Sequence, residues 1–417
     1  MIGRAVHLAV LGINYAPEST GIAPYTTELA AGMAARGHRV QVLTGFPHYP
    51  QWRRIDGGEG LRAEEPIDQV TVRRFRHHVP SRASTLGRVV METTFGLQLL
   101  TTRWNRPDVV ICVTPPLVAA ALSVARARLS SKRPSIGIVV HDLYGHGVVE
   151  TGTMSGMSAS AVRAVESTVL RTADGVAVIH DGFADILAND LSVDRRRIRT
   201  IRNWNHVARP DPAASARFRA AHGWDPDDVV VMHAGNMGIK QGLDNVVAAA
   251  WLADRQRCRV RFVLLGDGNQ RARLEAAGAG IVALQFLPPV SEAEFTSALG
   301  AADVLLVNEL PGITQMAVPS KLTSYFNSGK PVLAATDADG FTAMEIAGSG
   351  AGIRVPGDRP DLLLREALRL GTDRALAARM GEAGRRYCAA YLSADDALDR
   401  YEQWILDMER ARHRVEA

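Results

Sequence analysis

The sequence has few cysteines, few lysines and no long apolar run. Its three cysteines lie far apart, which excludes a disulfide scaffold and favours the reducing cytoplasm. The longest stretch without a charged residue, residues 109–125, has only 17 residues and two prolines at its middle. Since a membrane span needs about 20 apolar residues, we expect a strand, a turn and a helix there. The first eleven residues lack the features of a signal peptide.

A strong net charge is also missing. Lys and Arg number 48 against 44 Asp and Glu, a formal charge of +4. This is too small to predict a nucleic-acid partner, although it permits an anionic substrate or membrane surface. The basic residues comprise 44 arginines and only 4 lysines. A lysine in a loop near a site is therefore more informative than usual, although chance placement explains any one of them equally well.

The length of 417 residues predicts two or three domains at about 150 residues each. Short apolar runs alternate with helical patterns, which predicts α/β domains with doubly wound parallel sheets. Residues 208–215 are rich in proline and small side chains, as linkers are. We therefore expect two Rossmann-like domains in tandem. The expected strands are residues 6–11, 40–43, 109–113, 136–140, 176–179, 229–233, 260–265, 281–284, 304–307 and 332–335.

The last part of the chain is predicted to be helical. Leu398, Tyr401, Ile405 and Met408 form an apolar stripe at helical spacing, after residues 393–396, which can cap a helix. Such a stripe needs a surface to pack against, and one of the two domains is the simplest candidate.

Ligands of open parallel sheets bind beyond the carboxyl ends of the strands, so loops there are the candidate sites. Residues 12–21 run into a helix that starts near Pro24, where free N–H groups favour an anion. This loop is not the G-x-G-x-x-G pattern, which disfavours NAD. A structural turn and a ligand loop are equally compatible with it.

Residues 235–242 have the composition that a diphosphate needs. Three glycines free the backbone donors, a helix follows, and Lys240 adds a full positive charge beside Asn236 and Gln241. We expect a phosphate-binding loop here.

Two further turns follow strands of the second domain. Gly266 and Gly268 can lie under a nucleotide or form a plain turn. Ser320 can cap a helix that we expect at residues 322–327, with Lys321 pointing from its first turn. A lysine at that position opposes the helix dipole, so we expect an anion nearby, the alternative being an exposed lysine.

His141 and Asp142 end a predicted strand of the first domain. A histidine beside a carboxylate can transfer protons or bind hydroxyl groups, although such a pair is also a common structural contact. Asp337 and Asp339 form a loop pair for which a metal is disfavoured, because no further ligand clusters with them in sequence.

A basic stretch precedes an apolar helix candidate at residues 89–100, an arrangement that suits an anionic membrane surface. An ordinary solvated stretch before a core helix is equally compatible. The basic residues are Arg73, Arg74, Arg76, His77, His78 and Arg82.

Taken together, the motifs resemble family-4 retaining glycosyltransferases, in particular the colanic-acid and O-antigen branch that includes acetylfucosaminyl transferases. The resemblance spans nearly the whole chain. It rests on GINYAPESTGIAPYTTEL (12–29), LTGFPHYP (43–50), VTPP (113–116), HDL (141–143), GNMGIKQGL (235–243), LLGDG (264–268), VPSKL (318–322) and SGKPV (328–332).

This resemblance implies the GT-B fold, in which two Rossmann-like domains face each other across a cleft. It implies an acceptor domain at residues 1–205, a donor domain at residues 206–388 and a C-terminal segment, residues 389–417, that crosses back to the first domain. It also implies a nucleotide-sugar donor, UDP- or GDP-linked, a glycan or polyprenyl-linked acceptor, and no metal or other cofactor. We expect a cytoplasmic protein, peripheral at the inner face of the plasma membrane.

The expected site follows from the loops and the resemblance together. For catalysis we expect His141, Asp142, Lys240 and Lys321. For donor binding we expect Gly235, Asn236, Gln241, Gly242, Gly266, Gly268, Leu287, Gln315 and Ser320. For an acceptor or phosphate loop we expect Glu18, Ser19, Thr20, Gly21 and His48.

The sequence departs from the wider family at several positions. The family's two glutamates, which have seven residues between them, fall on Met316 and Ser324, and an arginine of the donor loop falls on Asn236. The family's lysine before the last glycine of that loop falls on Gln241, so Lys240 and Lys321 become the candidates for diphosphate charge. The branch's usual Trp-Pro is Tyr144-Gly145.

We therefore expect retaining sugar transfer, in which helix N-termini and two lysines stabilise the leaving diphosphate. Two other classes stay open. A non-hydrolysing nucleotide-sugar epimerase shares the fold and needs no acceptor, and a non-catalytic partner subunit would explain the missing glutamates.

Overall fold

The computed structural model describes residues 5–49, 51–54, 60–80, 84–143, 157–314 and 320–416. The chain forms two compact units. The N-terminal unit comprises Met1–Asn203 and Ala394–Ala417, and the C-terminal unit comprises Trp204–Ser393. The unit boundaries therefore lie two residues before the first predicted boundary and five residues after the second.

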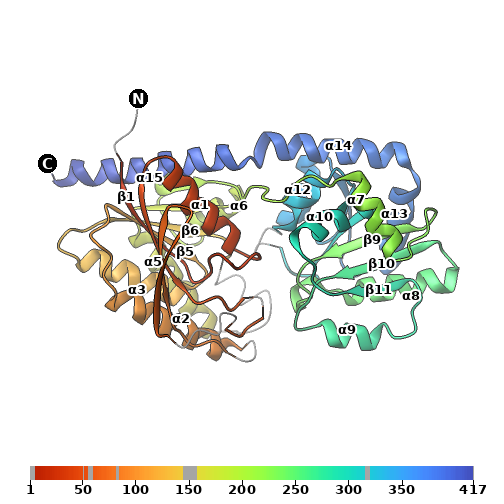
Figure 1. The fold of residues 1–417 in the computed structure, drawn as a ribbon, viewed down its shortest axis with the longest axis horizontal. Helices are drawn as coiled ribbons and strands as arrows, with labels where there is room; N and C mark the ends of the chain where they lie inside the picture. The colour runs from red at the N-terminus through yellow and green to blue at the C-terminus, as the bar shows by residue number, and fades with distance from the viewer. Residues whose placement is uncertain are drawn as a thin grey trace. The chain divides into compact units, whose positions relative to one another are not determined.

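The N-terminal unit contains an eight-stranded sheet in the order β3-β4-β2-β1-β5-β6-β7-β8. All neighbouring strands are parallel except β3 and β4, which pair antiparallel at one edge. The strands are β1 (His7–Leu11), β2 (Arg39–Gly45), β3 (Arg62–Ile67), β4 (Val70–Phe75), β5 (Val109–Thr114), β6 (Ser135–Val140), β7 (Gly175–Val178) and β8 (Ile198–Thr200). The helices are α1 (Ala23–Ala35), α2 (Thr85–Thr101), α3 (Leu117–Leu129), α5 (Met157–Thr172), α6 (Asp181–Asn189) and α15 (Ala394–Glu416) (Figure 1).

The C-terminal unit contains a six-stranded, fully parallel sheet in the order β11-β10-β9-β12-β13-β14. Its strands are β9 (Val229–Ala234), β10 (Val260–Leu265), β11 (Leu284–Leu287), β12 (Val304–Asn308), β13 (Val332–Ala335) and β14 (Gly352–Val355). Its helices are α7 (Pro212–Ala221), α8 (Asp244–Gln256), α9 (Arg271–Ala277), α10 (Glu292–Ala301), α11 (Lys321–Ser328), α12 (Phe341–Ser349), α13 (Pro360–Thr372) and α14 (Arg374–Tyr391), with a short 3-10 helix η2 (Ile239–Gln241).

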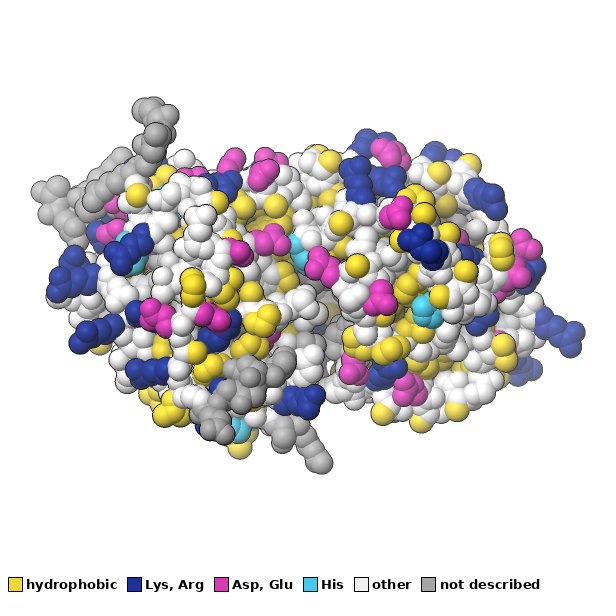
Figure 2. All heavy atoms as spheres, in the orientation of Figure 1, with side chains coloured by type: hydrophobic (Ala, Val, Ile, Leu, Met, Phe, Trp, Pro, Cys, Tyr) yellow, Lys and Arg dark blue, Asp and Glu magenta, His cyan; other side chains and the backbone are white. Residues whose placement is uncertain are grey.

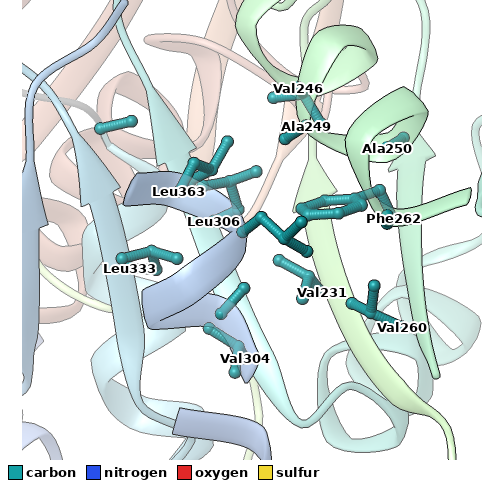
Figure 3. Close-up of a cluster of buried hydrophobic side chains, with 14 of the residues drawn as sticks. Val231, Val246, Ala249, Ala250, Val260, Phe262, Val304, Leu306, Leu333 and Leu363 are labelled. Atoms are coloured by element: carbon teal, nitrogen blue, oxygen red, sulfur yellow. The ribbon is translucent and has the colours of Figure 1, made fainter. Parts of the chain in front are cut away.

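The apolar strands are buried on both faces, as near-continuous hydrophobic runs in parallel sheets require. One core cluster of the C-terminal unit shows how this works (Figure 3). Val231 of β9 and Leu306 of β12 lie with Phe262 of β10 against Val246 of α8 and Leu363 of α13, and all five are fully buried. The prediction of doubly wound α/β sheets is confirmed.

One strand prediction was wrong in part. The apolar run at residues 281–284 is mostly a turn, and β11 begins only at Leu284. The backbone N–H groups of Val282 and Ala283 donate to the Asp254 carboxylate of α8, at 2.6 and 2.9 Å, so neither N–H takes part in strand pairing. The Ala283 carbonyl accepts from the Phe262 N–H of β10 at 2.7 Å. The β3–β4 hairpin was not predicted, because β3 is polar and largely exposed at the sheet edge.

The last helix, α15, packs on the N-terminal unit, and its predicted apolar stripe is buried. Trp404 occupies space left by two glycines, since a Cβ on Gly137 or Gly175 would come within 2.5 or 2.6 Å of its ring. The Ser135 hydroxyl of β6 donates to the Met408 carbonyl at 2.9 Å. The helix is therefore part of this unit's core. Within the described ranges, no helix has the length and apolar character needed to cross a membrane.

Candidate functional site

In the C-terminal sheet, the strand order reverses between β9 and β12, which are direct neighbours. Crevices at the carboxyl ends of such a strand pair are the usual ligand sites of open α/β sheets. The predicted phosphate loop, residues 235–242, follows β9, while Glu309 follows β12.

The loop after β9 pairs closely with the turn after β10. The N–H of Gly235 donates to the Leu265 carbonyl and that of Met237 to the Asp267 carbonyl, both at 2.8 Å. A Cβ on Gly266 would lie 2.0 Å from the Gly235 carbonyl oxygen, and one on Gly268 would lie 2.4 Å from that of Met237. Gly266 and Gly268 are therefore required by the approach of two backbones, which favours the turn over direct nucleotide contact.

An amide network fixes the rest of the phosphate loop. The Gln241 side-chain oxygen accepts from the Gly238 N–H at 2.9 Å, so this side chain is engaged within the loop. Gly242 has a φ of +52° and leads into α8. The Asn308 side chain donates to the carbonyls of Gln241 and Gly242 at 2.8 and 3.0 Å, and Asn245 donates to Asn308 at 2.9 Å. The loop is thereby attached to the end of β12.

Two polar side chains of the phosphate loop are available to a ligand. Asn236 is exposed and Lys240 is half-buried. Among the residues that the structure describes, the Lys240 ammonium has neither a hydrogen bond nor an ion pair, whereas its backbone carbonyl accepts from the Leu310 N–H at 2.7 Å. The loop therefore presents a positive charge that no described protein group neutralises.

Lys321, the first residue of α11, turns its ammonium toward the end of β9. Its Nζ lies 3.2 Å from Nε2 and 3.4 Å from Nδ1 of His233, a fully buried residue. A Cβ on Gly235 would lie 3.6 Å from the same nitrogen, so Lys321 lies directly beside the phosphate loop. Burial lowers the pKa of Lys321 to about 7, against the opposing influence of Glu309. Burial, followed by the charge of Lys321, holds the pKa of His233 well below its usual value, so this ring is neutral.

Glu309 is a carboxylate that sequence reasoning missed. It accepts hydrogen bonds from the hydroxyls of Thr336, which follows β13, and of Thr342 in the first turn of α12, the latter at 2.8 Å. Burial raises the pKa of Glu309, while these hydroxyls and Lys321 favour its charged form. A glutamate directly after an apolar strand was the available signal, but both threonines lie far along the chain.

The remaining donor-loop predictions have mixed outcomes. Ser320 is exposed and its side chain does not cap α11, so the capping prediction was wrong; its carbonyl accepts from the Thr323 hydroxyl at 2.8 Å. Leu287 is buried, and its carbonyl accepts from the Gly266 N–H at 3.0 Å. Gln315 and Met316 lie outside the described residues, while the buried Ser324 hydroxyl donates to the Lys321 carbonyl at 2.9 Å.

In the N-terminal sheet the strand order reverses between β1 and β5, and residues 12–21 follow β1. Glu18 of this loop is buried, and its carboxylate accepts from the N–H groups of His48 and Tyr49 at 2.7 and 2.8 Å and from the Asn14 amide at 2.8 Å. These contacts join the loop to the segment after β2. They give Glu18 and His48 a structural role that requires no ligand. The neighbouring residues Ser19, Thr20 and Gly21 are exposed.

His141 follows β6 in the same sheet and is 6% exposed. Its ring stacks on that of Tyr25 from α1, with centroids 5.8 Å apart, and burial lowers its pKa to about 4. Its Nδ1 has no hydrogen-bond partner among the described residues. Asp142 is half-buried, and its charge adds to burial in raising the pKa of Tyr49. His141 is therefore a neutral ring whose Nδ1 is buried and has no hydrogen-bond partner among the described residues. Tyr144 and Gly145 lie outside the described residues.

Known proteins match this chain over both units. The glycosyl transferase 4-like domain matches residues 20–204, and the glycosyl transferases group 1 domain matches residues 215–387. A putative colanic acid biosynthesis glycosyl transferase of Escherichia coli, WcaI, is 33% identical over 335 residues, which is 77% of this chain and 81% of that protein. The chain belongs to this glycosyltransferase family.

Solved structures show that the glycosyltransferase has the GT-B fold. A sucrose-phosphate synthase from Thermosynechococcus elongatus matches with a TM-score of 0.74 at 17% identity, covering 98% of this chain and 100% of the other. The Anabaena protein HepE, solved in complex with UDP-glucose, matches with a TM-score of 0.70 at 14% identity, covering 96% and 100%. The fold predicted from the resemblance is confirmed.

The basic stretch of the glycosyltransferase differs from the predicted solvated surface. Arg74 is buried, donates to the Glu65 carboxylate at 2.5 Å and also bonds the carbonyls of Gly45 and Ala16. The His77 ring packs edge-on against His48 and Phe95. The prediction of a surface role was therefore wrong for Arg74 and His77. Arg76 and His78 are exposed, and Arg82 lies outside the described residues.

The predicted carboxylate pair, Asp337 and Asp339, lies in the C-terminal unit. Asp337 accepts from the Gly312 N–H at 2.7 Å and Asp339 is exposed. No cluster of three or more metal-ligating side chains occurs in the part of the chain that the structure describes. On the face drawn in Figure 2, basic and acidic side chains are interspersed.

Proposed function

We propose that the protein transfers a sugar, with retention of anomeric configuration, from a UDP- or GDP-sugar to a glycan or polyprenyl-linked acceptor in surface-polysaccharide assembly. The observation that carries this proposal is the pair of lysines at the switch point of the C-terminal sheet. Lys321 lies beside the glycines of the loop after β9, and Lys240 belongs to that loop. Two ammonium groups beside a strand-to-helix loop suit a diphosphate.

In the proposed reaction, the acceptor oxygen forms a bond to the anomeric carbon while the bond from that carbon to the diphosphate breaks. The acceptor proton passes to an oxygen of the leaving diphosphate. Stabilising the charge that develops on this group is the main electrostatic requirement. In this proposal, Lys240 and Lys321 meet this requirement without a metal.

On the acceptor side, we infer that His141 and Asp142 orient the acceptor. The buried, neutral ring of His141 offers an unpartnered Nδ1, which can accept a hydrogen bond from a hydroxyl group. The exposed residues Ser19, Thr20 and Gly21 precede α1, where free N–H groups suit a phosphate of a lipid-linked acceptor.

Similar proteins support the donor and the pathway. The E. coli relative is described as a colanic acid biosynthesis glycosyl transferase, and HepE was solved with UDP-glucose. The proposed location is the cytoplasm, at the inner face of the plasma membrane.

A screen of sugar nucleotides tests this function. Purified protein is mixed with UDP-, GDP- and ADP-sugars, donor binding is followed by thermal shift, and products formed with membrane extract are analysed. We expect one donor class to stabilise the protein and to give a product with the anomeric configuration of the donor. An inverted product would contradict the mechanism.

A matched pair of variants tests the role of the lysines. Lys321→Met removes the ammonium beside the phosphate loop, and we expect donor affinity to fall at least about tenfold, as the loss of a charge-assisted contact implies. Lys132→Met makes the same change at an exposed residue of the N-terminal unit and should leave affinity unchanged. Equal effects of both variants would count against the proposed site.

The same screen separates the alternative classes. An epimerase would convert the sugar nucleotide without any acceptor, and a non-catalytic subunit would neither convert nor tightly bind it. Addition of EDTA tests metal independence, for which we expect unchanged transfer.

For membrane association, we propose α2 as the contact. Leu86, Val89, Val90 and Leu97 lie along one face of this helix and are all exposed. An exposed apolar stripe suits a bilayer interface, and the exposed Arg76, which precedes the helix, suits an anionic one. Sedimentation with vesicles should therefore increase with the fraction of anionic lipid and decrease for Leu97→Gln; sedimentation that ignores anionic lipid would contradict the proposal.

A further inference from the structure

An open cavity of about 330 Å³ lies in the C-terminal unit, at the end of the sheet opposite to the phosphate loop. Asp303 and Lys330, which line the cavity, precede β12 and β13, whereas the phosphate loop follows β9. Helices α7, α10 and α14 complete the wall with Ser215, Gly300 and Arg385, respectively. The cavity is therefore separate from the candidate donor site.

One arginine and the carboxylate of the cavity form a structural pair. The Arg219 guanidinium donates to the Asp303 carboxylate at 3.0 Å, and this carboxylate also accepts from the Val230 N–H at 2.8 Å. The guanidinium further donates to the carbonyls of Ala301 and Asp228, at 3.1 and 2.6 Å. These contacts join α7 to α10 and to the start of β9, and the two charges neutralise each other.

Lys330 and Arg385 provide positive charge that no carboxylate balances. Among the described residues, neither side chain has a carboxylate within ion-pair distance. The Arg385 guanidinium donates to the Ser328 carbonyl at 3.1 Å, and it lies against Gly329, where a Cβ would come within 2.2 Å of Nε. The Lys330 ammonium makes no hydrogen bond in the part of the chain that the structure describes.

Capping of a helix end does not account for Lys330. Basic side chains near the last turn of a helix often interact with its free carbonyl groups. Arg385 does so through its bond to Ser328, the last residue of α11. Lys330 follows the same helix end, yet within the described ranges its ammonium donates to none of these carbonyls. A half-buried ammonium of this kind suits an acceptor that a ligand supplies.

The charge and the size of the cavity indicate the class of ligand. Two cations without a carboxylate suit a dianion, and the oxygens of a phosphate group accept from both an ammonium and a guanidinium. Pro210, Pro212 and Ala216 make another part of the wall apolar. The volume of about 330 Å³ falls within the range of small-molecule sites, roughly 300–1,000 Å³, so it suits an organic phosphate.

We propose that this cavity is a second anion site, which binds a small, soluble phosphomonoester: Lys330 and Arg385 hold the phosphate group, and the apolar wall contacts the organic part. Arg219 and Asp303 fix the wall without adding net charge. The inference rests on the C-terminal unit alone and does not depend on the proposed function.

NMR of the lysines tests the site on the full-length protein. The chain has only four lysines, so ¹³C-methylation of their amines gives a simple spectrum, in which Lys330→Met identifies the Lys330 signal. Burial lowers the pKa of Lys330; Asp303 opposes this effect, and Arg219 and Arg385 add to it. A bound phosphate should raise this pKa, because it stabilises the charged form. The probes are inorganic phosphate and glucose 1-phosphate, and we expect both to shift the Lys330 signal and to leave that of the exposed Lys132 in place.

The response of the Lys330 signal decides the outcome. A signal that moves with neither probe at about 10 mM, where even a weak site is filled, overturns the inference. So does a response confined to Lys240 and Lys321, which would support phosphate binding at the proposed donor site only. A response of Lys330 in a protein that binds no sugar nucleotide supports the inference and contradicts only the proposed function.

A matched pair of variants measures the contribution of Arg385. We expect Arg385→Gln to weaken the calorimetric affinity for glucose 1-phosphate about tenfold, as the loss of a charge-assisted contact implies. Arg386→Gln makes the same change at the next, exposed residue of α14, which does not line the cavity, and should have less than about a 2-fold effect. Lys330→Met should match the loss at Arg385 without removing a hydrogen bond between described residues. Equal effects of Arg385→Gln and Arg386→Gln would overturn the proposal, because general surface charge would then explain the binding.

A lipid headgroup can present the same phosphomonoester. Vesicles that contain phosphatidate distinguish this source from a soluble ligand. We expect the soluble probes to bind and the vesicles to sediment wild type and Lys330→Met equally. Sedimentation that depends on Lys330, together with no binding of either soluble probe, would overturn the assignment of a soluble ligand.

Discussion

Glycine serves opposite purposes at different positions of the C-terminal unit. At Gly266 the backbone has a φ of +133° and a Cβ would collide with the Gly235 carbonyl, 2.0 Å away. At Gly348, within α12, no atom lies within 4 Å of the position of a Cβ. The first glycine is required by the approach of two loops, whereas the second only adds freedom to the unfolded chain.

Alanine substitutions should therefore change stability in opposite directions. We expect Gly266→Ala to cost more than about 3 kcal/mol, because both the backbone conformation and the packing forbid a Cβ. Gly348→Ala should gain about 0.5–1 kcal/mol. Urea unfolding of the full-length protein measures both, and a mild effect at Gly266 would mean that the two loops can separate.

Acid should destabilise the N-terminal unit through His141. Burial lowers the pKa of His141 from 6.5 to about 4, so between these values the unfolded chain binds a proton that the folded chain does not. The contribution of His141 to the free energy of unfolding is therefore fully present above pH 6.5. It is lost as the pH drops toward 4, which lowers the free energy of unfolding by about 3 kcal/mol at most.

The variant His141→Gln lacks this titration and should lose less stability between pH 6.5 and 4.5 than the wild type. The His77 ring, whose pKa burial lowers to about 3, titrates in both proteins and cancels in the comparison. Calorimetric melting across this range measures the difference; parallel pH profiles would contradict the assigned titration.

The predictability of individual residues depended on where their partners lie. Lys240 and Lys321 could be found from the sequence, because lysines are rare here and both border a predicted strand-end loop. Glu309 and His233 could not, since their roles depend on Thr336, Thr342 and Lys321, which only the folded sheet brings near them.

At the scale of elements, buried strands could be predicted from the sequence more readily than exposed ones. The strands β9, β10 and β12 are buried along nearly their whole length and consist mainly of apolar residues. In contrast, β3 is exposed and polar. The exposed Val282 lies in a turn, although its apolar side chain favoured the prediction of a strand. Edge strands carry a weaker hydrophobic signal because only part of their surface is covered.

The helix α15 yields an element-scale prediction. Trp404 fills the space above Gly137 and Gly175, so Trp404→Ala leaves a cavity and should cost about 3–5 kcal/mol. We expect calorimetry to show a lower melting temperature for the N-terminal unit and an unchanged one for the C-terminal unit. Gln403→Ala, an exposed neighbour, serves as the control and should change neither transition. A shift of the C-terminal transition alone would contradict the assignment of this helix.

At the scale of the whole molecule, the two units differ in how they use the chain. The C-terminal unit is one continuous segment, Trp204–Ser393, whereas the N-terminal unit needs residues from both ends. We expect residues 204–393 alone to unfold cooperatively, because their core is complete. Residues 1–203 alone should aggregate, because the apolar surface that α15 covers is then exposed. Circular dichroism and light scattering measure the two outcomes, and a stable, monomeric 1–203 fragment would contradict the second.

The return of α15 also sets an order of events during synthesis. Residues 1–203 leave the ribosome first, yet the helix that completes their core is translated only after the 190 residues 204–393. At about 5–20 residues per second, roughly 10–40 s pass between the synthesis of residue 203 and the start of the synthesis of α15. Throughout that interval the surface around Gly137 and Gly175 is open to chaperones, and a ribosome that stalls before residue 394 releases a product whose first half is unfinished.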